Sequence, residues 1–195
     1  ITNNAVISGS LANQVAIADN FSSVNSVTYN NMINNGTVSL TGDGSVAIYA
    51  NNGNITNSSA VSATGKESFG IYGENGTVST NTGAITIGDQ GVGIYGVSYQ
   101  DPSNPGANGG GLINITNSGS ITGTGGSGTI GIYSNTNRTG GTKGDAVVTL
   151  SGGTINLGNV TEAIGVYVNK GTVNDTGSTI TVGKNGIGIY AKDSD

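Results

Sequence analysis

The sequence contains neither cysteine nor histidine. Their absence excludes Ser-His-Asp and Cys-His nucleophile systems, the usual zinc sites and any disulfide. Charge is also scarce, because 9% of residues are charged, the net charge is −5, and the six lysines and arginines are scattered singly. Nucleic-acid binding needs a basic cluster to meet phosphates, so that function class is disfavoured. No apolar run is long enough to span a bilayer, and we expect no direct membrane insertion of this segment.

What the sequence does contain is a recurrent four-residue phrase, called here the Tyr phrase: an apolar residue, Ala or Gly, Ile or Val, then Tyr. The tyrosines are separated by 23, 23, 38, 34 and 23 residues. This spacing indicates a repeat array of period 23 with insertions. The copies are Val46–Tyr49, Phe69–Tyr72, Val92–Tyr95, Ile130–Tyr133, Ile164–Tyr167 and Ile187–Tyr190, with Val15–Ala18 as an earlier, degenerate copy.

Each repeat also holds two further apolar patches. The patch before the Tyr phrase alternates, as in Ile85-Thr86-Ile87, and the middle patch is weaker, as in Ile113-Asn114-Ile115. A period of two predicts strands, and the Gly, Asn, Asp and Ser between patches predict turns. One short unit cannot bury its own apolar side, but stacked units can. The sequence therefore predicts an all-β parallel β-helix (β-solenoid) of about seven coils, with three short strands per coil and right-handed winding.

The excess over the period predicts three loops inserted after the Tyr phrase, over about residues 19–25, 97–110 and 135–145. The second and third loops follow adjacent coils, so their bases should lie ~4.8 Å apart along the rod. Loops on one face of a repeat array often carry binding, although solenoid corners also tolerate neutral insertions. The candidate partner-binding residues are Tyr99, Asp101, Arg138, Lys143 and Asp145.

Residues 1–195 are expected to form a single segment of a longer rod. The repeat starts and stops in mid-pattern, and neither end resembles a polar cap that would protect open strand edges. Flanking coils of the same chain are therefore expected partners.

The Gly-Ile-Tyr repeats, the turn Asn75-Gly76-Thr77-Val78 and the stretch from Thr82 to Gly88 resemble the passenger regions of bacterial (type V secretion) autotransporter adhesins, most of all the large fusobacterial ones. The resemblance covers essentially the whole chain. It implies a non-enzymatic rod on the extracellular side of the outer membrane, or a secreted one. It also implies that this rod binds a host-cell or bacterial surface protein or glycan.

Carboxylates recur at one corner of the predicted coil, five or six residues before a tyrosine of the repeat. They are Asp43, Glu67, Asp89 and Glu162, with Lys184 at the equivalent place later. A glycosidase, lyase or calcium site is one interpretation, and a solvated stripe that keeps the rod soluble is the other. Acid–base catalysis needs two carboxylates that converge across a cleft, whereas these are spread along an axis. We therefore expect no catalytic residues, no metal site and no cofactor.

A second stripe consists of tyrosines. If the first and third residues of each Tyr phrase point inward, the tyrosines point outward beside small Ala or Gly. The stripe is either an aromatic platform for sugars or a flanking domain, or a stacking ladder that stabilises the solenoid. Its members are Tyr49, Tyr72, Tyr95, Tyr133, Tyr167 and Tyr190, and the expected interior row is Val46, Ile48, Ile71, Ile94, Ile132, Val166 and Ile189.

The function expected from the sequence is that of an adhesin or stalk segment without enzymatic activity. A polysaccharide lyase or hydrolase on the same β-helix is the first alternative, since fold alone does not exclude it. A purely structural spacer or an ice-binding rod is the second. Ice binding would want a flat, uninterrupted Thr array, which the mixed positions Ser39, Thr86, Asn156 and Thr181 and the insertions disfavour.

Overall fold

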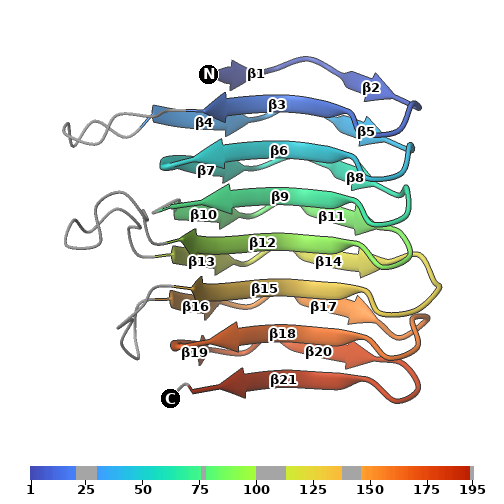
Figure 1. The fold of residues 1–195 in the computed structure, drawn as a ribbon, viewed down its shortest axis with the longest axis vertical. Coiled ribbons are helices and arrows are strands. Elements are labelled where there is room, and N and C mark those ends of the chain that lie inside the picture. Colours follow the sequence, from blue (N-terminus) through green and yellow to red (C-terminus); the bar gives the residue numbers. More distant parts are fainter. Residues whose placement is uncertain (21–29, 76–77, 100–112, 138–145, 194–195) are drawn as a thin grey trace.

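The computed structural model of the chain is a rod of seven stacked coils (Figure 1). It describes all residues except 21–29, 76–77, 100–112, 138–145 and 194–195. Each coil visits three sheets in the order A, B, C, and every strand pairs in parallel with the equivalent strand of the next coil. The predicted β-solenoid with three short strands per coil is confirmed. None of the described residues belongs to a helix that could cross a membrane.

Sheet A collects the weak middle patches of the repeat. Because Asn, Thr and Ile alternate there, one face is polar and the other enters the core, as in the pattern of β13. Its strands are β1 (Thr2–Asn3), β4 (Asn30–Asn34), β7 (Gly53–Asn57), β10 (Val78–Asn81), β13 (Ile113–Asn117), β16 (Ala146–Leu150) and β19 (Gly171–Asp175).

Sheet B collects the strictly alternating patches. Their β-branched residues suit the stacked positions of a pleated surface, because their side chains are stiff. Its strands are β2 (Ile7–Gly9), β5 (Val38–Leu40), β8 (Val61–Ala63), β11 (Ala84–Ile87), β14 (Ser120–Gly123), β17 (Thr154–Leu157) and β20 (Thr179–Val182).

Sheet C contains the Tyr phrases and has the longest strands. Figure 1 shows it as the front layer, with sheets A and B behind it. Its strands are β3 (Val15–Asn20), β6 (Val46–Asn51), β9 (Phe69–Glu74), β12 (Val92–Tyr99), β15 (Ile130–Asn137), β18 (Ile164–Asn169) and β21 (Ile187–Lys192).

The interior row of the Tyr phrase is formed by its third residue. Ile48, Ile71, Ile94, Ile132 and Val166 are fully buried in the core, whereas Ile189 in the last coil remains 44% exposed. Full burial of such a side chain is worth ~1.5–3 kcal/mol. Placing Val46 in this row was wrong. Val46 pairs with Phe69, whose ring stacks on Tyr72, so the first residue of the phrase shares the outer face with the tyrosines.

The recurrent glycine at the second position of the phrase is explained by the inward direction of its missing side chain. A Cβ added to Gly131 would lie 2.6 Å from Cγ2 of Ile155 in sheet B and 2.5 Å from the carbonyl oxygen of Gly165. At Gly131 sheets B and C approach each other too closely for a side chain, whereas the second coil accommodates Ala47 at this position as a fully buried residue. The second and third residues of the phrase therefore both lie on the inner side of the sheet.

The corner between sheets A and B contains a buried asparagine ladder that the sequence analysis missed. Asn34, Asn57, Asn81 and Asn117 are at most 1% exposed. Each Nδ2 donates to Oδ1 of the next asparagine, at 2.8 Å from Asn34, 2.7 Å from Asn57 and 2.8 Å from Asn81. The ladder ends at Asn117, which pairs with Leu150. Its side chains are thus satisfied without water, as buried polar groups must be.

We predict that Gly131→Ala destabilises the rod by ~1–3 kcal/mol, because the added methyl overlaps both a side chain and a backbone carbonyl. Gly188→Ala is the matched control, since Gly188 holds the same phrase position in the last coil and a Cβ there meets nothing within 4 Å. Urea unfolding followed by tyrosine fluorescence measures both. Equal stability of the two variants would refute the close approach of sheets B and C.

A second prediction compares two positions of the asparagine ladder. Asn81→Leu breaks two hydrogen bonds of the ladder, besides the bond to the Gly83 carbonyl, and leaves Oδ1 of Asn117 without its donor, which costs ~1–3 kcal/mol. Asn117→Leu breaks one such bond and leaves no buried oxygen without its ladder donor, because Leu150 follows it. Asn81→Leu should therefore have the lower urea midpoint. The reverse order would show that the ladder does not carry this energy.

Candidate functional site

The inserted stretches leave the rod at the corner between sheets C and A. Strands β12 and β15 are each eight residues long, and their last pairs are Ser98 with Thr136 and Tyr99 with Asn137. The predicted loop starts at Val97 and Asn135 were therefore too early, and Asp19, the predicted start of the first loop, belongs to β3. The physical reason is that neighbouring coils both continue past the usual corner, so each extension gives the other a hydrogen-bonding edge.

The second and third insertions are rooted side by side, as predicted. Tyr99 pairs with Asn137 where the chain leaves sheet C, and Ile113 pairs with Ala146 where it enters sheet A. The corner between sheets C and A does not contain all the residues in excess of the 23-residue period. Six residues separate Gly123 from Ile130 in the preceding corner, compared with four between Ile87 and Val92 in the coil before.

Of the candidate binding residues in these insertions, only Tyr99 belongs to a described strand. The main chain of Tyr99 is fixed by its pairing in β12, but its side chain lies outside the described part of the structure. Asp101, Arg138, Lys143 and Asp145 lie outside the described residues.

The strand extensions beneath the insertions carry buried hydroxyl groups, which sequence reasoning did not find. Ser98, Ser134 and Thr136 are at most 1% exposed, and within the described part of the chain their hydroxyl oxygens have no hydrogen-bond partner. Buried hydroxyls of this kind are commonly satisfied by ordered water. The neighbouring coils place Gly96 or Val168 where Ser134 stands, so the hydroxyl at this position is particular to the coil of β15.

The tyrosine stripe lies on the outer face of sheet C, in register from coil to coil. Tyr95, Tyr133, Tyr167 and Tyr190 stack with ring centroids 4.8, 4.7 and 5.4 Å apart and planes within 14° of parallel. Tyr49, Tyr72 and Tyr95 instead meet edge to face, at 5.5 and 4.8 Å. Along the parallel part, each inner ring has a neighbour on both faces. A sugar stacks on a free ring face, so this geometry favours the ladder over the platform for sugars.

A carboxylate anchors the N-terminal part of the stripe. Glu74, at the end of β9, accepts hydrogen bonds from the hydroxyls of Tyr49 at 3.0 Å and Tyr72 at 2.7 Å. One side chain thus accepts hydrogen bonds from two rings of successive coils. No periodicity in the sequence marks Glu74, because Asn51 and Val97 hold the equivalent positions.

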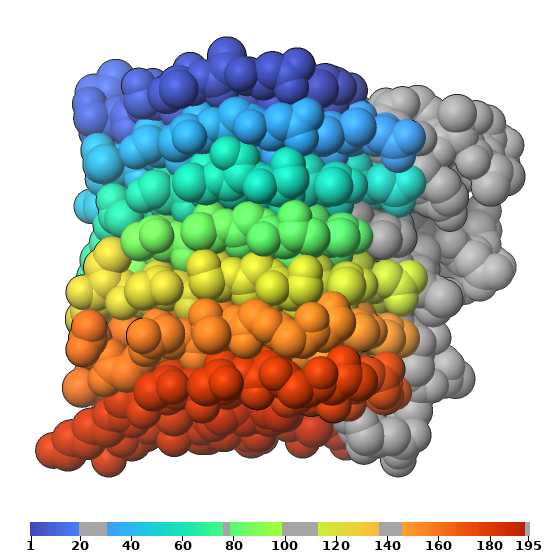
Figure 2. Space-filling model, turned by 180° about the vertical axis from the view of Figure 1, so that it is seen from behind, coloured from blue at the N-terminus to red at the C-terminus, as the bar shows by residue number. Residues whose placement is uncertain are grey.

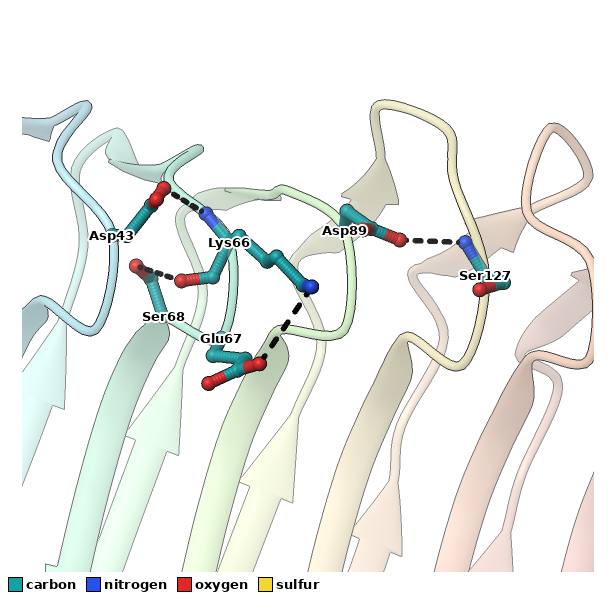
Figure 3. Close-up of polar contacts among 6 residues, drawn as sticks. All are labelled: Asp43, Lys66, Glu67, Ser68, Asp89 and Ser127. Atoms are coloured by element: carbon teal, nitrogen blue, oxygen red, sulfur yellow. Dashed lines mark hydrogen bonds and ion pairs between the residues drawn. The ribbon is translucent and has the colours of Figure 1, made fainter.

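Two of the four corner carboxylates, Asp43 and Asp89, bind main-chain groups of the neighbouring coil (Figure 3). Asp43 accepts the N–H of Lys66 at 2.8 Å, and Asp89 accepts the N–H of Ser127 at 2.7 Å. Glu67 forms an exposed ion pair of 3.9 Å with Lys66. No group of three or more His, Cys, Asp or Glu that could hold a metal ion occurs within the described ranges. The arrangement stabilises turns and brings no two of these acids together across a cleft.

Glu67 and Glu162 occupy a backbone conformation that disfavours them. Their φ angles are 56° and 55°, and their amides donate to carbonyls of the next coil, those of Asp89 and Lys184. Asn13 and Asn185 hold the same corner position with φ of 59° and 58°. The conformation therefore recurs at this corner, also in the last coil at Asn185, and asparagine tolerates it better than glutamate.

We accordingly predict that Glu67→Asn stabilises the rod by ~0.5–1 kcal/mol, since it relieves left-handed strain. Lys66→Asn is the control, because it removes the same ion pair at a residue without positive φ. Thermal denaturation should give a higher midpoint for Glu67→Asn than for Lys66→Asn. A lower midpoint would show that backbone strain does not limit stability at this corner.

No protein-family model, no curated protein and no solved structure matches the chain. A functional assignment therefore depends on the fold and on the corner between sheets C and A.

Proposed function

We propose that the chain is a non-enzymatic adhesin or stalk segment of a bacterial surface protein of the autotransporter type, exposed on the extracellular side of the outer membrane. Its partner is a host-cell or bacterial surface protein or glycan. The observation that carries the proposal is the adjacent rooting of two insertions at one corner of a regular rod. A rigid scaffold that holds two inserted segments side by side is the usual arrangement of a binding surface.

The regular parts of the rod support a scaffold role. Its coils repeat without change of register, and the space-filling view from behind shows them as parallel layers (Figure 2). Two of the corner acids that a hydrolase or lyase would need are engaged with main-chain amides, Asp43 with Lys66 and Asp89 with Ser127. They also belong to different coils, so they follow one another along the axis. Neither feature favours the enzymatic alternative.

The test removes both insertions by deleting residues 100–112 and 138–145. Each deletion returns the distance between sheets C and A to that of the uninterrupted third coil, where Val78 follows Tyr72 by six residues. We expect the rod to stay folded, because solenoid corners accept length changes cheaply. Beads that carry the variant with both deletions should lose at least ~90% of the adhesion that the parent chain shows to cultured epithelial cells and to bacterial cells, as expected when a binding surface is removed.

The matched control is deletion of residues 22–29, which shortens the insertion of the first coil and leaves the paired insertions intact. It should keep both the fold and the adhesion. Adhesion that survives the double deletion, or a parent chain that adheres to neither cell type, would contradict the proposed binding role. Hydrolysis or cleavage of a polysaccharide by the parent chain, abolished by Asp43→Asn or Asp89→Asn, would favour the enzyme instead.

A further inference from the structure

The three outer faces of the rod differ in chemistry. On sheet A a column of hydroxyl side chains runs through Thr56, Thr80, Thr116 and Thr149. On sheet B the corresponding column contains Ser39, Ser62, Thr86 and Thr122. Sheet C instead presents two parallel columns of apolar and aromatic residues, the first and fourth positions of the Tyr phrase. These columns, called here the apolar face, are Val15, Val46, Phe69, Val92, Ile130, Ile164 and Ile187, and Ala18 followed by the six stripe tyrosines.

The two columns of the apolar face are continuous from coil to coil. Neither column contains a charged residue in any of the seven coils, although the carboxylate of Glu74 borders the tyrosine column and accepts hydrogen bonds from Tyr49 and Tyr72. Most members are half-buried by their neighbours, and the exposure rises to 53% at Val15, 43% at Ile187 and 40% at Tyr190. No described strand outside sheet C packs against its outer side, which forms the front of the molecule in Figure 1. Contiguous apolar surface of this kind marks an interaction site.

The face has a ridge on each side of a bare strip. The second and third residues of each phrase both lie on the inner side, so no side chain projects outward between the two columns. The columns are three residues apart, which is ~10 Å along a strand. A ridge of tyrosines on another surface, with the same spacing along its length, would fit this strip.

We propose that the apolar face binds the same face of a second copy of this chain, with the two rods side by side and pointing in the same direction. A two-fold axis parallel to the rods reverses the strand direction across the interface. The tyrosine ridge of each copy then lies over the bare strip of the other, and both ridges are used. If the rods point in opposite directions, the strands of the two faces run in the same direction. Only one of the two tyrosine ridges can then lie over the bare strip of the other copy. The self-complementary arrangement is therefore the one with like polarity.

A second copy fits better than other occupants. Only another regular solenoid repeats at the same ~4.8 Å along the whole face. Because neither column carries a charge, two chains of net charge −5 can meet along these columns without placing one charged column against another. Sugars are disfavoured because neighbouring rings cover the ring faces along the parallel part of the stripe.

The expected affinity follows from the size of the face. Seven strands span ~30 Å, and two columns with their side chains span ~15 Å, so the interface buries roughly 900 Å² in total. This lies at the lower end for specific association, and the dimer should be weak and concentration-dependent. The proposal does not rest on the adhesin function, since it uses no residue of the insertions.

The first test uses the absence of cysteine. Tyr167→Cys places a single thiol on the apolar face, and Asn156→Cys places one on the exposed face of sheet B in the same coil. In a glutathione redox buffer, Tyr167→Cys should form disulfide-linked dimers at least ~10-fold faster, because the two-fold axis brings like residues together. Equal rates would overturn the proposal. Cross-linking of Tyr167→Cys only when it is mixed with Tyr49→Cys would overturn the like polarity.

The second test needs no substitution within the tyrosine ladder. Sedimentation equilibrium of the parent chain should show a monomer–dimer equilibrium that Ile130→Glu weakens at least ~10-fold, because a charge would be buried in the interface. Thr122→Glu adds the same charge to sheet B in the same coil and should leave the equilibrium unchanged. A monomeric parent chain, or equal effects of the two variants, would contradict the proposal. Loss of the dimer in Ile189→Lys but not in Ile130→Glu would indicate end-to-end stacking instead.

Discussion

The parallel hydrogen bonding of each strand to its equivalent in the next coil is the constraint on which the rest of this structure depends. It forces equivalent residues into columns one strand spacing apart. Every column then needs a residue that tolerates a copy of itself above and below. Isoleucine does so in the core, asparagine in the A–B corner and tyrosine on the outer face. The three columns differ in chemistry, but in each of them the side chains of successive coils make favourable contacts with their own kind.

The corners show how length changes are accommodated. In uninterrupted coils the C–A corner contains a single residue of positive φ, such as Asn52, Asn75 or Lys170, whose amide donates to the next coil. In the described part of the chain, the side-chain amide bonds near this point are only part-buried, from Asn75 to Asn51 and from Asn169 to Asn135, so the corner can accept extra length. The A–B corner contains the buried asparagines, whose amides also bond to main-chain carbonyls two residues on. An insertion there would interrupt those bonds, and the long insertions of the described coils lie elsewhere.

Much of the fold could be predicted from the sequence. The period of 23 residues gives the register in which the coils stack, and the apolar–polar alternation shows which side chains of a strand point inward. Side-chain direction within the Tyr phrase could not be predicted, since two consecutive residues point inward and strict alternation placed Val46 on the wrong side. The adjacency of the two insertions followed from the repeat, whereas their starting points did not, because mutual pairing extends β12 and β15. Glu74 and the asparagine ladder were missed because each depends on a neighbour from another coil.

The most direct measurement of this constraint is the unfolding of a chain from which one whole coil has been removed. Deletion of residues 69–91 joins Ser68 to Val92, which holds the position of Phe69 in the register of sheet C. The shortened chain should unfold cooperatively in urea, with an m-value lower by roughly one seventh because less surface is exposed. Deletion of residues 69–90 leaves one residue too many and should lose stability, since a one-residue slip turns side chains to the other face. Equal stability of the two deletion variants would contradict the account.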